Sequence, residues 1–218
     1  MGARLQQIID EIQKTRSLLL TKVSGLTQSE IDFRPVPDQW SIGEILHHLS
    51  IIENQVTHVA AKQIQRAEKM GLAPDPSDES VLHSLDQFAI ETAPQKITSP
   101  QFAVPTKGMK KEDLLEELKR SRIALMEKLS TAHAIDLSRL QFPHPVLGRL
   151  DMYQWILYIG KHEQRHINQI ELLRSAMAPD HLPDAATEAM NMVSDRVGTS
   201  RDEFVADASR TALKKESW

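Results

Sequence analysis

Four stretches of the chain carry apolar residues at helical spacing, with polar residues on the opposite side. The second stretch opens at Ser41, which forms a capping-box pattern with Glu44, and the fourth opens at Asp151, a suitable N-cap. Such amphipathic stripes are the buried seams of packed helices. The sequence therefore predicts an all-α protein, a four-helix bundle with helices over residues 5–23, 41–70, 110–131 and 151–177.

The connections between these helices differ in length. Residues 26–39 are predicted to be a loop, and residues 142–150 a rigid, proline-containing turn. Residues 71–108 contain five prolines and form a connection that is unusually long for a compact domain. We expect a short helix at about Glu79 to Ala89 and a path that crosses the bundle. A long crossover of this kind places the second and third helices parallel.

Two histidines interrupt the apolar stripe of the fourth stretch. His162 and His166 are four residues apart, so their rings project from adjacent turns of one helix face. They can reach one ion, or they can be ordinary core histidines, and a third ligand elsewhere would favour the metal interpretation. The stripe consists of Trp155, Ile159, His162, His166, Ile170, Leu173 and Met177.

The second stretch contains three more histidines, which differ in direction. At about 100° per residue, His48 lies about 60° from the seam residue Ile45, whereas His47 lies about 160° away. His48 can therefore point inward, and His47 and His58 are predicted to face water. His144 stands between two prolines on the turn before the fourth helix. One interpretation is that the turn holds this histidine in position near the mouth of the bundle.

Two carboxylates are close in sequence to the inward histidines. Glu44 lies one turn before His48, and Glu163 follows His162. Carboxylates in such places can orient a metal-ligating ring. We interpret both as surface carboxylates, because the helical wheel places them away from the seam.

The composition excludes several classes of function. The 26 Lys and Arg and 30 Asp and Glu give a net charge of −4, and the two signs are mixed, so no nucleic-acid partner is predicted. No segment approaches the roughly 20 apolar residues of a membrane helix, so we expect a cytoplasmic protein without a membrane partner. The chain has no cysteine. Any metal site must therefore use nitrogen and oxygen ligands, and any thiol chemistry needs an external thiol.

The chain divides into two parts. Residues 1–180 are predicted to form the bundle domain, and residues 181–218 a C-terminal extension of short helices or partly disordered chain. Ser200 and Glu203 form a capping-box pattern there, ahead of a weak apolar face. Because that face has no obvious partner in a closed bundle, we predict a homodimer.

Three motifs in combination resemble the DinB-like family. They are W-S-I-G-E-I-L-H-H-L (Trp40–Leu49), F-P-H-P-x-x-G (Phe142–Gly148) and H-E-Q-R-H-I-N-Q-I (His162–Ile170). The resemblance covers about residues 5–177. That family includes YfiT-type proteins described as metal-dependent hydrolases, and relatives that act as bacillithiol or mycothiol S-transferases.

The resemblance implies an up-down-down-up bundle that holds a divalent ion at one end. Matched residue by residue, the ligands of the family fall on His48, His162 and His166. Zinc or nickel is favoured on three nitrogens, and iron and manganese are compatible with them. Three ligands leave a position open for water or substrate, as in catalytic sites.

Three functions are compatible with such a site. The favoured one is a metal-dependent S-transferase that joins a low-molecular-weight thiol to a small-molecule substrate. The alternatives are a metal-dependent hydrolase and a non-catalytic, stress-related metal-binding bundle. The sequence assigns no catalytic residue beyond the metal ligands.

Overall fold

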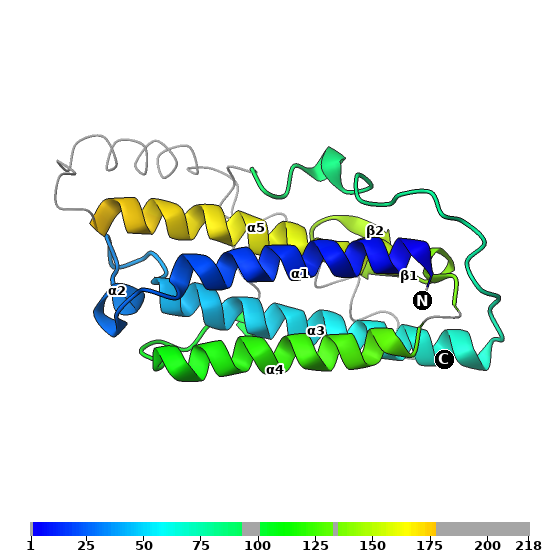
Figure 1. Cartoon of the computed structure of the whole chain (residues 1–218), viewed down its shortest axis with the longest axis horizontal. Coiled ribbons are helices and arrows are strands. Elements are labelled where there is room, and N and C mark those ends of the chain that lie inside the picture. The colour runs from blue at the N-terminus through cyan, green and yellow to red at the C-terminus, as the bar shows by residue number, and fades with distance from the viewer. Residues whose placement is uncertain (1, 93–100, 133–134, 178–218) are drawn as a thin grey trace. The chain divides into compact units, whose positions relative to one another are not determined.

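Four long helices make up the bundle. The structure, a computed structural model, describes residues 2–92, 101–132 and 135–177. The helices are α1 (Ala3–Val23), α3 (Ile42–Lys69), α4 (Lys111–Ser130) and α5 (Met152–Met177). Figure 1 shows α1 and α5 running in one direction and α3 and α4 in the other. The predicted all-α, up-down-down-up four-helix bundle is confirmed.

Side-chain caps explain why two helix starts were predictable. Ser41 Oγ accepts the backbone N–H of Glu44 at 3.2 Å, and the Glu44 carboxylate accepts the N–H of Ser41 at 2.8 Å. Asp151 and Gln154 form the same reciprocal pair at the start of α5, at 2.9 and 3.1 Å. Each pair satisfies backbone N–H groups that the first helical turn leaves without partners.

Two of the connections contain regular structure that the sequence did not predict. A short helix, α2 (Gln28–Asp32), lies within the expected loop and is capped by Thr27 and Glu30. The expected rigid turn before α5 is a hairpin of β1 (Gln141–His144) and β2 (Gly148–Asp151), which follows the 3-10 turn η3 (Leu137–Arg139). Gly148 has a φ of 78°, a left-handed value that suits glycine at this tight turn.

The long connection crosses the bundle as predicted, but the prediction of a helix at Glu79 to Ala89 is wrong. Only the 3-10 turns η1 (Asp86–Phe88) and η2 (Gln101–Ala103) occur in its described part. Side chains of α5 bind this segment: Gln154 donates to the Ser84 carbonyl at 3.3 Å, and Lys161 pairs with Asp86 at 3.3 Å. A helix this short is marginal by itself, so these contacts decide the conformation.

The core consists of two apolar clusters. One gathers residues such as Leu5, Ile12, Leu129 and Ile156, and the other Leu19, Ile45, Leu118 and Ile167. On every long helix a charged residue separates the two sets. These four residues, called the charge layer below, are Arg16, Glu53, Arg122 and Glu163.

The described part of the chain contains no helix that is long and apolar enough to cross a membrane. The predicted C-terminal extension, with its capping-box pattern at Ser200 and Glu203, lies outside the described residues.

Candidate metal centre

His48 enters the site from the second turn of α3. Its side chain is buried, and its Nδ1 atom lies 2.8 Å from the carbonyl oxygen of Ala103 in the crossover. A carbonyl can only accept a hydrogen bond, so Nδ1 carries the proton. The lone pair of His48 is therefore on Nε2, and the predicted inward direction of this residue is confirmed.

His162 and His166 meet on one face of α5. Their Nε2 atoms are 3.2 Å apart. The Nδ1 atom of His166 donates to the side-chain oxygen of Gln169 at 3.0 Å, which fixes the tautomer of that ring. The two rings therefore turn their Nε2 atoms toward a common point, as the i, i+4 spacing predicted.

The three predicted histidines form one cluster, called the histidine cluster below. One ligand atom from each of His48, His162 and His166 lies within 4.8 Å of the others. Zinc–nitrogen bonds of about 2.0–2.1 Å at a tetrahedral angle place two ligand nitrogens about 3.4 Å apart. The 3.2 Å between the two α5 nitrogens is close to this value. The residues present therefore fit a divalent ion.

Burial keeps these rings neutral. It lowers the pKa of His48, and it lowers the pKa of His162 well below the usual histidine value. The pKa of His166 falls to about 3, mainly through burial and further through the neighbouring His48. Neutral imidazole is the form that binds a metal ion, so all three lone pairs are available near pH 7.

Two aromatic side chains enclose the cluster. The Trp40 ring lies 4.8 Å from the ring of His48 and stacks on His166 at 6.4 Å between centroids. Tyr158 stacks on His162 at 5.2 Å. These rings restrict the orientation of the histidines and reduce the water around them, which is one cause of their lowered pKa values.

The other two histidines of α3, His47 and His58, lie outside the cluster. His58 is exposed, as predicted. His47 is not on a solvated face, because its side chain is only 14 % exposed and its Nδ1 atom accepts the N–H of Thr106 at 2.8 Å. The wheel identified its direction away from the cluster, but the crossover covers that side of α3.

His144 occupies the hairpin and not the cluster. Its Nδ1 atom accepts the N–H groups of Val146 and Leu147, each at 3.1 Å. Its ring packs on Trp155 and Tyr158 at 4.8 and 4.6 Å, and burial lowers its pKa to about 4. The hairpin therefore holds the ring of His144 in place, and the ring contacts lead through Tyr158 to His162.

The sequence suggested that Glu44 and Glu163 are surface carboxylates, but both are buried. Glu44 is 2 % exposed and binds Arg34 at 2.6 Å besides capping α3, and Glu163 is 1 % exposed within the charge layer. The groups that orient the cluster are instead the Ala103 carbonyl and the Gln169 amide. Gln169 has a sequence signal, since it follows His166 by three residues, whereas a backbone carbonyl has none.

Comparison with known proteins places these features in context. The family model described as the DinB superfamily matches residues 11–170, well over half of the 218-residue chain. The uncharacterized protein YuaE of Bacillus subtilis (strain 168) is 26% identical over 154 residues, which are 70% of this chain and 88% of YuaE. The crystal structure of TT2238, a four-helix bundle protein, aligns with 77% of this chain and 98% of its own, at 18% identity and a TM-score of 0.49.

Proposed function

The chain belongs to the DinB superfamily, and from this premise we propose that His48, His162 and His166 bind a catalytic divalent metal ion. The observation that carries the proposal is the shared direction of three neutral imidazoles. The Ala103 carbonyl and the Gln169 amide each hold an Nδ1–H, and this leaves Nε2 of His48 and His166 as ligands. Outer hydrogen bonds of this kind are typical of histidine metal sites.

Three nitrogen ligands favour zinc or nickel and leave at least one coordination position open. When bound, such an ion lowers the pKa of a thiol or water molecule in that position. The chain's contribution is to hold three neutral rings in place and to surround them with Trp40 and Tyr158. This arrangement supports a catalytic site more than a closed structural one, in which four protein ligands would complete the coordination.

We further propose that the reaction is an S-transfer from a low-molecular-weight thiol to a small electrophile. The thiol loses its proton to solvent, its sulfur forms a bond to the electrophilic carbon, and the leaving group departs with the electrons of the broken bond. Two facts support this choice: the chain contains no cysteine of its own, and the motifs resemble those of thiol S-transferases. A hydrolase would use water at the same position.

The test uses full-length protein, purified without a histidine tag and loaded with zinc or nickel. A panel of low-molecular-weight thiols is offered with a chlorinated aromatic electrophile, and products are identified by mass spectrometry. The S-transferase proposal expects a thioether that requires both thiol and metal and is absent with His166→Ala. His58→Ala is the matched control, because it removes an exposed histidine from α3. Ester hydrolysis that needs metal but no thiol would instead establish the hydrolase.

A further inference from the structure

Two adjacent histidines of α3 hold the same short segment of the crossover. His48 Nδ1–H donates to the carbonyl of Ala103, and His47 Nδ1 accepts the N–H of Thr106, both at 2.8 Å. The two contacts have opposite polarity and are three residues apart in the crossover. Residues 103–106, called the clamped segment below, are therefore attached to α3 at both ends.

Among the described residues, the two histidines provide the hydrogen bonds between the clamped segment and α3. Ala103 and Pro105 are buried, whereas Val104 and the preceding Phe102 are 55% and 59% exposed. The Val104 N–H already donates to the Gln101 carbonyl at 3.4 Å, and Pro105 has no N–H group, so Thr106 supplies the first amide after η2 that is available to α3. The hydrogen bond to His47 is thus well placed to decide where the Ala103 carbonyl lies.

The surroundings of His47 fix its own orientation. Because Nδ1 accepts a hydrogen bond, the ring carries its proton on Nε2, which lies 3.6 Å from the Glu117 carboxylate of α4. Ser50 also approaches this carboxylate, at 3.4 Å. The ring of His47 is held between the crossover on one side and α4 on the other.

We propose that His47 is a positioning residue of the metal centre. By holding Thr106, it fixes the Ala103 carbonyl, and that carbonyl sets the tautomer and ring orientation of His48. His47 itself contributes no ligand. The inference rests on the proposed function where it concerns the ion, and on the clamped segment alone where it concerns the His48 ring.

The experiment compares two substitutions at one position. His47→Leu removes the acceptor, whereas His47→Asn retains an oxygen acceptor close to the place of Nδ1. Zinc affinity is measured by competition with a chromogenic chelator at pH 7.5, with His58→Leu as the control for loss of a histidine from the same helix. We expect affinity about 10-fold weaker in His47→Leu, as for other outer contacts of metal ligands, and wild-type affinity in His47→Asn and His58→Leu.

Two results would overturn the proposal: unchanged affinity in His47→Leu, or equal weakening in His47→Leu and His47→Asn. A second measurement needs no metal. In protein labelled with nitrogen-15 histidine, the Nδ1–H form of His48 should dominate in the wild type and His47→Asn and be lost in His47→Leu. If wild-type protein bound no ion, the proposed function would fail, and this spectrum would decide the positioning role, since an unchanged His48 signal in His47→Leu rejects it.

Discussion

The bundle contains two buried polar groups that draw on the same two helices. The charge layer takes Glu53 from α3 and Glu163 from α5, and the histidine cluster takes His48 from α3 and two residues from α5. Glu163 is the immediate neighbour of His162. Both groups interrupt an apolar interior, yet they differ in whether their members satisfy one another.

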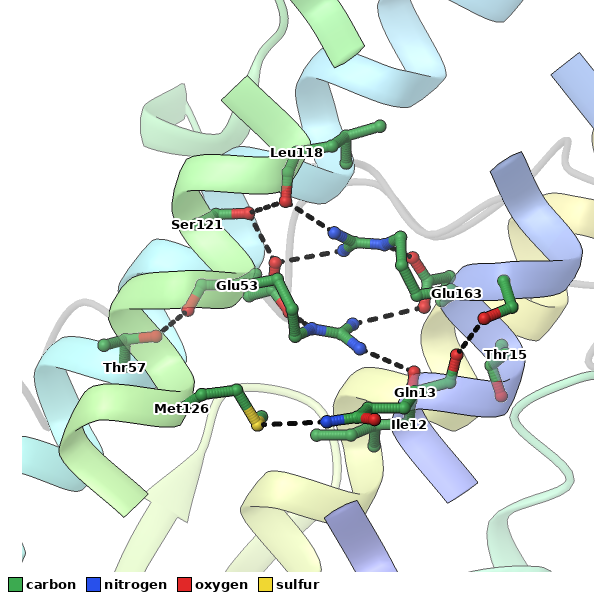
Figure 2. Close-up of polar contacts among 12 residues, drawn as sticks. Ile12, Gln13, Thr15, Glu53, Thr57, Leu118, Ser121, Met126 and Glu163 are labelled. Carbon is green, nitrogen blue, oxygen red and sulfur yellow. Dashed lines mark hydrogen bonds and ion pairs between the residues drawn. The ribbon is translucent and has the colours of Figure 1, made fainter. Parts of the chain in front are cut away.

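The charge layer is complete in itself. Arg16 binds Glu163 at 2.5 Å and Glu53 at 3.0 Å, and Arg122 binds the same two carboxylates at 3.4 and 2.6 Å. The guanidinium groups also donate to the carbonyls of Leu118 and Ile12, both at 2.6 Å; Figure 2 labels these two residues beside the carboxylates. Burial opposes the charge on Arg16, but Glu163 and Glu53 outweigh it and raise its pKa.

The histidine cluster is incomplete in itself. Its members are alike, and two of its outer nitrogens, those of His48 and His166, are bound by Ala103 and Gln169. Its inner nitrogens face one another, and within the described part of the chain a single hydrogen bond, between His162 and His166 at 3.2 Å, joins two of them. Burial disfavours a proton on these rings. A metal ion is the more suitable partner, because it forms coordination bonds to the neutral imidazole nitrogens. The comparison teaches that the pairing of buried polar groups, and not their burial, separates a structural layer from a binding site.

The largest effect should follow from breaking the charge layer. Glu53→Leu removes one of two carboxylates between Arg16 and Arg122 and leaves an excess buried charge. We expect the free energy of unfolding to fall by about 3–5 kcal/mol, measured by urea denaturation at pH 7. Glu117→Leu, at a partly exposed glutamate on α4, is the control and should change it by less than about 1 kcal/mol. Equal effects would mean that the layer is not a structural unit.

Breaking the histidine cluster should weaken zinc binding strongly and change the free energy of unfolding less. His166→Ala removes a ligand, and we expect zinc affinity to fall more than about 100-fold, beyond the usual cost of losing an outer contact. The metal-free variant should lose less stability than Glu53→Leu, because no charge is left unpaired. Isothermal titration calorimetry and urea denaturation measure the two quantities. Retention of one zinc ion per chain at wild-type affinity would rule out His166 as a ligand.

In metal-free protein, the histidine cluster should make the free energy of unfolding depend on pH. His166 has a pKa of about 3 in the fold and about 6.5 when unfolded, so between these values the unfolded chain binds more protons. The free energy of unfolding should therefore fall as the pH drops below about 6.5, with a slope of at most about 1.4 kcal/mol per pH unit for this ring. Urea midpoints from pH 7.5 to 5 measure the slope. The slope should be shallower in His166→Phe, and an identical slope there would contradict the assignment.

The smallest of these effects concerns an outer contact of the cluster. Gln169→Ala removes the acceptor that holds His166 Nδ1–H, and zinc affinity should fall about 10-fold. Gln169→Glu keeps an acceptor of similar length and should bind zinc at least as tightly as the wild type. Chelator competition measures both variants. Weakening by the glutamate variant as well would show that the shape of the amide, and not its acceptor, is what matters.

The helices and their approximate ends were determined by local sequence. Apolar spacing defined the buried stripes, and caps such as Ser41 with Glu44 defined the starts, because both act within one or two turns. The same local geometry placed His162 and His166 side by side and turned His48 inward. The resemblance to the DinB-like family then implied that these three histidines are the metal ligands.

Tertiary contacts decided what local periodicity could not. A helical wheel treats one stripe as buried, but α5 is covered on several sides, so Glu163 is inside although it lies off the stripe. Residues 79–89 follow α5 instead of forming a helix, because Lys161 and Gln154 bind them. His47 meets the crossover and not solvent for the same reason.

The sequence by itself determined which histidines share a helix face, since 3.6 residues per turn fixes that relation within a single element. Only the tertiary structure decided that His48 meets the α5 pair, because their separation depends on how α3 packs on α5. It alone decided that the Ala103 carbonyl orients His48. Every residue carries such a carbonyl, so its use at this site depends on the path of the crossover and leaves no mark in the sequence.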